Sequence, residues 1–318
     1  MQRIILDTDL AMGAPGSDVD DGFALALAHA DPDISLEMIT TVNGNTDVES
    51  ATILSAELVR RLGITGVPVI KGAAASFTHP EVRRIPAPHV AALAADLPAP
   101  APGYAAAEIA RYVLANPGEI TIVAIGPLTN VAGALLLDAA VATAVKEIVI
   151  MGGLFFGTMP NRDMPGEFNV WVDPEAAAAV LRSGASQRWV GLDVTLKVRI
   201  NRDHARQMLE APTQFAPFAG EATMAWIDHI HAANPGNAEE ADSCAMHDPL
   251  AVAVLTRPGL VEFKDVAVSI ITGDGPARGV MITDRRESAD PPPANARVAA
   301  SVDAEGFIAH FLGHLVGL

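Results

Sequence analysis

The chain has 318 residues, half of them hydrophobic, which suits one large α/β domain or two small ones. Its formal net charge of −17 at pH 7 argues against a nucleic-acid partner and against an anionic membrane surface, because both require clustered Lys and Arg. The single cysteine, Cys244, excludes an intramolecular disulfide framework and fits a reducing compartment. With no signal-peptide pattern and no apolar run near the roughly 20 residues of a membrane helix, we expect a cytoplasmic protein.

Short apolar runs alternate with helical patterns through the first 200 residues. Most of the apolar runs lack polar alternation, as expected for buried parallel strands. The predicted strands are Arg3–Asp7, Leu36–Val42, Val67–Ile70, Ile120–Ile125, Glu147–Met151 and Arg188–Leu192. The predicted helices are Gly22–Ala30, Val48–Leu62, Tyr104–Ala115, Leu128–Asp138 and Pro174–Arg182. This rhythm predicts an α/β fold with a mostly parallel central sheet, helices on both faces, and an active site at the strand C-termini.

Three segments interrupt the rhythm: Ala73–Pro102, Gly153–Asn169 and Asn234–Ser243. The second is a Gly/Pro/Asn loop directly after a strand, and loops of that length are usually functional or disordered. The tail predicts a last strand at Ala296–Val302 and a docked helix at Gly306–Val316. Since neither a repeat nor a strong linker divides the chain, we expect a single domain over residues 1–318.

Five carboxylates fall between the first strand and the first helix: Asp7, Asp9, Asp18, Asp20 and Asp21. Like charges this close raise one another's pKa unless a cation lies among them. Oxygen ligands favour Ca²⁺ or Mg²⁺ over zinc. The alternative is that Asp20 or Asp21 caps the helix, but capping does not account for Asp7 and Asp9 at the strand end. The segment therefore predicts a divalent-metal site.

Four further segments carry candidate polar groups, and three of them lie after predicted strands or in the long loop. Asn45 ends Thr41–Asn45, which is either a turn or a hydroxyl-binding site. The Ile125 carbonyl, before Gly126-Pro127, can ligate a cation. Glu167 and Asn169 are two residues apart in the long loop and would face the same way.

The fourth segment is His247-Asp248-Pro249, directly before a helix-like run. Asp248 can be an N-cap with Pro249 at N1. His247 can act as an acid near neutral pH.

Seven motifs occur in an order that resembles the inosine-uridine-preferring nucleoside hydrolase family, from Ile4 to about Asp248. They are Asp-Thr-Asp…Asp-Asp, Thr-Thr-Val-x-Gly-Asn, Gly-Pro-Leu-Thr-Asn, Met-Gly-Gly, Glu-Phe-Asn, Asp-Pro-Glu-Ala-Ala and His-Asp-Pro. Each motif is weak alone, but the ordered set is specific. The resemblance implies an enzyme that hydrolyses the N-glycosidic bond of ribonucleosides to free base and ribose, through an oxocarbenium-like transition state. It also implies a role in purine and pyrimidine salvage and a homodimer or homotetramer.

The resemblance implies a Ca²⁺ ion as cofactor, with Asp9, Asp21, Asp248 and the Ile125 carbonyl as ligands. Asp9 is also the implied general base, which takes a proton from water activated by Ca²⁺. Asp7 fits a position behind the ligands that orients the loop.

The same resemblance implies a set of substrate contacts. Those to the ribose hydroxyls are Asp20, Asn45, Asn161, Glu167 and Asn169. His247 matches the residue that protonates the departing base. His79, in a loose match to a His-Gly motif, and Trp226, in a helix-like run, are further candidates beside the base.

The chain departs from the family pattern at Leu10–Val19, ten residues between Asp9 and Asp20 where the family has about three. The insert is rich in Gly and Pro, so we expect it to bulge out over the site. It also offers Asp18 as a rival ligand to Asp20.

Two other functions fit parts of the sequence. A haloacid-dehalogenase-like Mg²⁺ phosphatase also begins with a strand and Asp-x-Asp, and would make Asp7 the nucleophile. However, neither Lys146 nor Lys197 stands in the context such an enzyme expects. A non-catalytic calcium-dependent nucleoside- or sugar-binding protein would keep the pocket, but the presence of both Asp9 and His247 argues against it.

Overall fold

The computed structural model describes residues 1–14, 16–80, 84, 90, 92–286 and 290–318. Its centre is an eight-stranded sheet in the order β3-β2-β1-β4-β5-β6-β12-β9. The strands are β1 (Gln2–Thr8), β2 (Ile34–Thr41), β3 (Val69–Lys71), β4 (Ile120–Ala124), β5 (Glu147–Met151), β6 (Gln187–Val190), β9 (Val261–Val266) and β12 (Ala296–Val302). All neighbours pair in parallel except β9, which is antiparallel to β12. The predicted fold class, with its mostly parallel sheet, is therefore confirmed.

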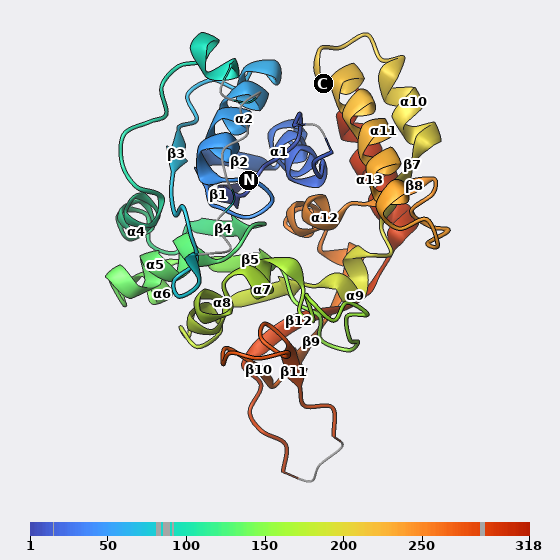
Figure 1. Ribbon diagram of the computed structural model, residues 1–318. Coiled ribbons are helices and arrows are strands. Elements are labelled where there is room, and N and C mark those ends of the chain that lie inside the picture. The colour runs from blue at the N-terminus through green and yellow to red at the C-terminus, as the bar shows by residue number, and fades with distance from the viewer. Residues whose placement is uncertain (15, 81–83, 85–89, 91, 287–289) are drawn as a thin grey trace.

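Helices cover both faces of the sheet (Figure 1). The α-helices are α1 (Asp20–Ala30), α2 (Val48–Arg61), α4 (Ala105–Ala115), α5 (Thr129–Leu137), α6 (Val141–Ala144), α7 (Phe168–Val172), α8 (Pro174–Leu181), α9 (Leu192–Thr195), α10 (Arg202–Leu209), α11 (Phe215–Ala233), α12 (His247–Ala253) and α13 (Ala304–Leu315). Two 3₁₀ turns span Leu93–Asp96 and Pro258–Leu260. Among the described helices, none is both long and apolar enough to cross a membrane.

Two hydrophobic cores lie on opposite faces of the sheet. One contains Phe23 of α1 and Phe307 of α13, and the other contains Ile109 of α4 and Val131 of α5. Every residue of β4 is buried, because apolar side chains leave it on both faces. This double burial is why the central strands carry continuous apolar runs instead of alternating ones.

The elements that the sequence patterns missed are mostly short. Two small antiparallel pairs join β7 (Arg199–Asn201) to β8 (Ser243–Ala245) and β10 (Val268–Ile270) to β11 (Met281–Thr283). Strands of three residues are too short to show a periodic pattern. The helix α11 extends well beyond the helical run recognised around Trp226.

The insert Leu10–Val19 lies over the site only in part, because Asp18 lines the cavity while the first residues of the insert turn inward. Leu10 and Met12 are buried in the core beneath α1. A Cβ on Gly16 would approach His229 of α11 to 2.9 Å, so the later part of the insert lies against that helix. The expectation fails for Leu10 and Met12, because large apolar side chains gain more from burial than from exposure above the cavity.

Candidate active site

The N-terminal carboxylates converge between the end of β1 and the start of α1. Asp9 and Asp21 are fully buried, and Asp20 is nearly so. Asp248, in the first turn of α12, packs beside them because α1 and α12 are neighbours. Asp20, Asp21 and Asp248 each offer a carboxylate oxygen within 4.8 Å of the others. Residues more than 220 positions apart in sequence thus form one cluster, held partly by the Asp248 N–H, which donates to Asp20 Oδ2 at 3.3 Å.

Burial and mutual repulsion make this cluster reluctant to ionise. Desolvation, followed by the charge of neighbouring carboxylates, raises the pKa of Asp9, Asp20 and Asp248 well above the usual range. Burial likewise raises the pKa of Asp21 to about 6. A bound cation would favour the ionised form of every member, and donors that are all oxygen suit Ca²⁺ or Mg²⁺.

Helix capping does not explain these residues. The N-cap of α1 is Val19 and that of α12 is Met246, neither with a side-chain capping bond. Asp20, Asp21 and Asp248 lie in first turns, where their charge also meets the positive end of the helix dipole. The capping alternatives for Asp20, Asp21 and Asp248 are therefore wrong.

Asp9 has one carboxylate oxygen bound and one without a partner among the described residues. Its Oδ2 accepts a 2.6 Å hydrogen bond from the Asn45 N–H, while Oδ1 is buried and unpaired. A Cβ on Gly44 or Gly126 would lie 1.9 Å or 2.9 Å from this carboxylate, so both positions require glycine to admit it. The unpaired oxygen is available to a ligand, and a cation suits it because Asp21 and the other carboxylates of the cluster lie close by.

Asp7 lies behind the cluster and does not line the cavity. Its Oδ1 accepts hydrogen bonds from Thr40 Oγ1 at 2.5 Å and from Asn130 Nδ2 at 2.8 Å. Burial raises its pKa to about 7. Asn130 also donates to the Thr41 carbonyl and accepts from the Ala73 N–H, so Asp7 helps to fix three strand ends. The bonds from Thr40 and Asn130 commit Asp7 to holding the strand ends together, which does not support its role as the nucleophile of a phosphatase.

A cavity of about 330 Å³ opens beside the cluster. Its polar lining comprises Asp18, Asp20, Asn45, Glu167, Asn169, His247 and Asp248, with Ile125 at the strand end. The remainder of the lining is apolar: Met151, Met159, Met164, Phe168, Leu192 and Leu196. Among the described residues, no lysine or arginine reaches the cavity. The cavity thus has a carboxylate-rich wall and a methionine- and leucine-rich wall.

Glu167 and Asn169 tie the long loop to the sheet edge. The Glu167 carboxylate caps α7 by accepting from the backbone N–H groups of Asn169 and Val170, and it also accepts from the Gly153 N–H. Asn169 Nδ2 donates to the Ile125 carbonyl at 2.9 Å and to the Met151 carbonyl at 3.2 Å. Asn169 therefore keeps its side-chain oxygen as the group that can accept from a hydroxyl.

Asn45 and Thr8 orient Asp21. Asn45 Nδ2 donates to Asp21 Oδ2 at 2.9 Å, and Thr8 Oγ1 donates to the other oxygen. Each oxygen retains a lone pair for a metal ion.

His247 is half-buried and lines the cavity. Its Nδ1 lies 2.7 Å from Thr195 Oγ1 in α9. Burial, with a smaller contribution from the positive charge of Arg199, lowers the pKa of His247 to about 4. The ring is therefore neutral at pH 7, and if Nδ1 accepts the threonine proton, the opposite nitrogen carries a hydrogen that can be donated.

Three predicted substrate contacts lie away from the cavity. Asn161 is exposed, and its Oδ1 accepts from the N–H groups of Asp163 and Met164 in its own turn. Trp226 packs against the core and stacks on His229, with ring centroids 5.5 Å apart.

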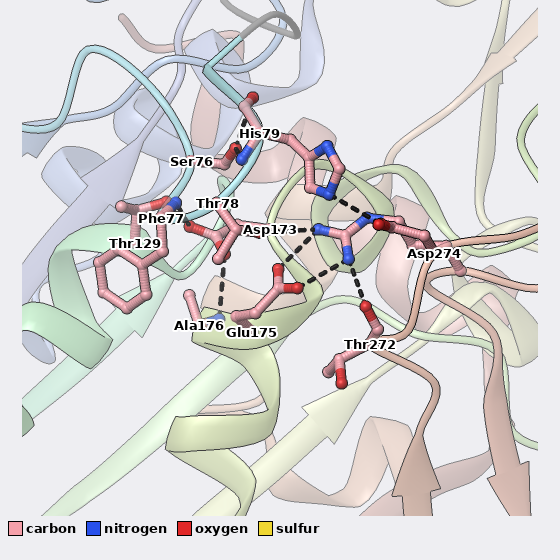
Figure 2. Close-up of polar contacts among 11 residues, drawn as sticks. Ser76, Phe77, Thr78, His79, Thr129, Asp173, Glu175, Ala176, Thr272 and Asp274 are labelled. Atoms are coloured by element: carbon pink, nitrogen blue, oxygen red, sulfur yellow. Dashed lines mark hydrogen bonds and ion pairs between the residues drawn. The ribbon is translucent and has the colours of Figure 1, made fainter.

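The third, His79, belongs to a separate polar network. Figure 2 shows its ring directed at Asp274, where Nε2 lies 3.1 Å from Oδ1. Arg278 joins the network by pairing with Glu175 through both carboxylate oxygens. The network fixes the 76–79 turn to α8 and to the segment between β10 and β11, which explains why His79 does not face the cavity.

The apolar wall is the part of the site that the sequence patterns did not reveal. Met159 and Met164 lie in a loop otherwise rich in Gly, Pro and Asn, and that local contrast is the signal that was available. Leu192 ends a predicted strand, and no sequence pattern singles out Leu196.

Comparison with known proteins agrees with this architecture. The model of the family "Inosine-uridine preferring nucleoside hydrolase" matches residues 4–309. The chain is 34% identical over 315 residues to the non-specific ribonucleoside hydrolase RihC of Salmonella newport (strain SL254), covering 96% of this chain and 94% of the relative. It is 30% identical over 278 residues to uridine nucleosidase 1 of Arabidopsis thaliana, covering 85% of this chain and 79% of the relative.

Solved structures give the same result. A plant nucleoside hydrolase, the PpNRh1 enzyme, superposes with a TM-score of 0.86 at 27% identity, over 100% of this chain and 99% of that one. The purine-preferring ribonucleoside hydrolase from Gardnerella vaginalis superposes with a TM-score of 0.84 at 28% identity, over 99% and 98% of the two chains. The chain therefore belongs to the inosine-uridine preferring nucleoside hydrolase family.

Proposed function

We propose that the protein hydrolyses the N-glycosidic bond of ribonucleosides, releasing the free base and ribose in the cavity beside the carboxylate cluster. Its family consists of enzymes that act on N-glycosyl compounds, and two relatives are a uridine nucleosidase and a ribonucleoside hydrolase. The observation that carries the proposal is the buried cluster of Asp9, Asp20, Asp21 and Asp248 beside a cavity with one polar and one apolar wall. A nucleoside has the same division into a polyhydroxylated sugar and a flat, largely apolar base.

Ca²⁺ is the cation we propose for the cluster, held by Asp9, Asp21, Asp248 and the Ile125 carbonyl. The unpaired Asp9 Oδ1 and the all-oxygen donor set support a hard cation. Asp20 is close enough to Asp21 and Asp248 to count as a further candidate ligand. When bound, Ca²⁺ supplies charge that orients and acidifies a water molecule.

Asp9 then acts as the general base that takes a proton from the attacking water. As the glycosidic bond breaks, positive charge develops on the ribose. The carboxylates of the polar wall stabilise that charge, while Asp20, Asn45, Glu167 and Asn169 hold the ribose hydroxyls. The contact of Asn161 with a ribose hydroxyl stays a prediction. In this structure its side-chain oxygen accepts hydrogen bonds within its own exposed turn.

The apolar wall is suited to the base. Phe168, Met164 and Leu196 offer flat or adaptable contact surface to a heterocycle. His247, neutral at pH 7, is placed to donate a hydrogen bond to the departing base as negative charge builds on it. His79 and Trp226 lie elsewhere, so we assign the base contacts to this wall instead.

The decisive experiment incubates the purified protein and Ca²⁺ with a panel of purine and pyrimidine ribonucleosides and, separately, with p-nitrophenyl phosphate. We expect free ribose from at least one nucleoside and its loss in Asp9→Ala. The matched control is Asp33→Ala, which removes an exposed aspartate. Phosphate release without ribose would favour the phosphatase. Tight ribonucleoside binding without any turnover would favour the binding protein.

For the cellular setting we propose nucleoside salvage in the cytoplasm by a homodimer or homotetramer. Cys244 is a buried free thiol, as expected for a protein of a reducing compartment. Light scattering coupled to gel filtration tests the assembly, and a monomeric mass at micromolar concentration would reject it.

A further inference from the structure

A second group of possible metal ligands lies at the other end of α1. The helix begins with Asp20 and Asp21, and its C-cap residue is Asp31. His310 and His314 of the C-terminal helix α13 face this carboxylate. One ligand atom from each of the three residues lies within 4.8 Å of the others.

The two histidines are one helical turn apart, so their side chains leave the same face of α13. Their ring centroids are 4.5 Å apart. Two histidines at i and i+4 are a common way for a helix to bind zinc.

Hydrogen bonds fix His314 in the tautomer that a metal requires. Its Nδ1 lies 2.8 Å from the His310 carbonyl oxygen, which can only accept. Nδ1 therefore carries the hydrogen, and Nε2 of the neutral ring presents a lone pair. Metal-binding histidines are typically oriented by such a bond from the other ring nitrogen.

Hydrogen bonds also hold the Asp31 carboxylate, but they do not use all of its lone pairs. Its Oδ1 accepts from the Asp33 N–H at 2.9 Å, and its Oδ2 accepts from Thr256 Oγ1 at 2.6 Å. A carboxylate has about four lone-pair positions, so each oxygen can accept a further partner.

His310 is the residue that lacks a partner. Its side chain is only 8% exposed, and its Nε2 is buried with no hydrogen bond among the described residues. Asp31 Oδ2 lies 3.8 Å from this nitrogen, which is too far for a hydrogen bond. An ion bonded to both atoms at about 2.0–2.1 Å would span this separation.

The local charges permit a cation here. The site lies at the C-terminal end of α1, where the helix dipole is negative. Asp31 adds the negative charge of its carboxylate, and imidazole rings such as those of His310 and His314 bind a metal ion as neutral donors.

We propose that Asp31, His310 and His314 bind one divalent transition-metal ion, with Zn²⁺ as the best match. Imidazole nitrogens favour Zn²⁺ and related ions, whereas the all-oxygen cluster at the start of α1 favours Ca²⁺. Eleven residues separate the sites along α1, or roughly 16 Å at about 1.5 Å per residue. The ion would clamp α13 to the α1–β2 corner, far from the cavity, and its proposed role is therefore structural.

The test titrates Zn²⁺ into metal-stripped protein that has been saturated with Ca²⁺ to block the acidic cluster. Calorimetry and elemental analysis should give one tightly bound Zn²⁺ per chain. His314→Ala and Asp31→Asn should each weaken this binding at least about tenfold. His29→Ala is the matched control, because it removes an exposed histidine of the same helix end that is not part of the group.

Thermal unfolding provides a second measurement on the same proteins. Zn²⁺ should raise the Tm of the wild type and of His29→Ala, but not that of His314→Ala. Equal Zn²⁺ affinity in the wild type and both ligand variants would overturn the proposal. Zn²⁺ binding that disappears with excess Ca²⁺ would also overturn it, because the ion would then occupy the acidic cluster. A wild type that binds no Zn²⁺ under these conditions would likewise overturn the proposal.

Discussion

The two edges of the central sheet place their carboxylates in opposite electrostatic surroundings. At the amino edge, Glu37 of β2 accepts from Arg3 Nε at 3.0 Å and from the Tyr112 hydroxyl, and these bonds lower its pKa to about 2. At the carboxyl edge, Asp9 and Asp248 are crowded among like charges, and their pKa values are raised. The amino edge pairs its charges within the protein, which stabilises the fold. The carboxyl edge has no cationic side chain to pair with these carboxylates among its described lining residues, so a ligand can do so, as in many catalytic sites.

The largest expected effect comes from neutralising the carboxyl edge at Asp9. Asp9→Asn keeps the shape and the bond from the Asn45 N–H but removes the proposed base and one negative charge. We expect kcat/KM for ribonucleosides to fall about 10³-fold or more. Steady-state assays at saturating Ca²⁺ measure this, with Asp33→Asn as the exposed control. A loss of less than tenfold would remove Asp9 from the role of base.

His247→Ala should lower kcat for ribonucleosides about 10²-fold, because the departing base loses a hydrogen-bond donor. A p-nitrophenyl riboside has a leaving group that needs little such help, so its kcat should change only a few-fold. Comparing the two substrates in the same variant separates this role from a general loss of structure. Equal losses on both substrates would contradict the assignment.

The sequence predicts a region well when neighbouring residues determine its structure, and poorly when contacts between distant segments do. The bounds of β5 and β12 were predicted to the residue, because apolar composition and flanking residues mark strands locally. The carboxylates were predicted to meet because strand ends of a parallel sheet share one edge. The position of Asp248, far along the chain, required the family motifs.

The remainder of the site depends on tertiary packing that local patterns do not encode. His79 and Trp226 were expected near the base, but each is committed to contacts with distant segments. Met159 and Met164 reach the cavity through the course of a loop, which no periodicity specifies. In the insert Leu10–Val19, Gly and Pro content predicts a loop over the site, but the buried Leu10 and Met12 draw its first residues into the core and only Asp18 lines the cavity.

Stability without calcium gives the next comparison. Asp248→Asn removes a carboxyl group whose ionised form is disfavoured by burial and by its neighbours, so we expect the Tm measured in EDTA to rise by about 2–4 °C. In saturating Ca²⁺ the same variant should be less stable than the wild type, because it has lost a proposed ligand. Differential scanning calorimetry under both conditions tests this change of sign. If the variant is less stable than the wild type both in EDTA and in Ca²⁺, Asp248 is not destabilised by repulsion from the neighbouring carboxylates.

The smallest effect is expected at the amino edge, from Glu37→Gln. The variant weakens the pairing with Arg3, so the free energy of unfolding at pH 7 should fall by about 1–2 kcal/mol while kcat/KM stays within twofold. Since the folded pKa of Glu37 is about 2 and the unfolded value about 4.3, its contribution is fully present above about pH 4.3 and is lost as the pH falls toward 2. The stability difference between wild type and variant should therefore shrink between pH 5 and pH 3 in urea titrations. Glu119 is the more exposed carboxylate that pairs with the same Arg3, so Glu119→Gln is the matched control. It should lower the free energy of unfolding by less than Glu37→Gln does. A pH-independent difference would mean that Glu37 contributes through packing and not through its charge.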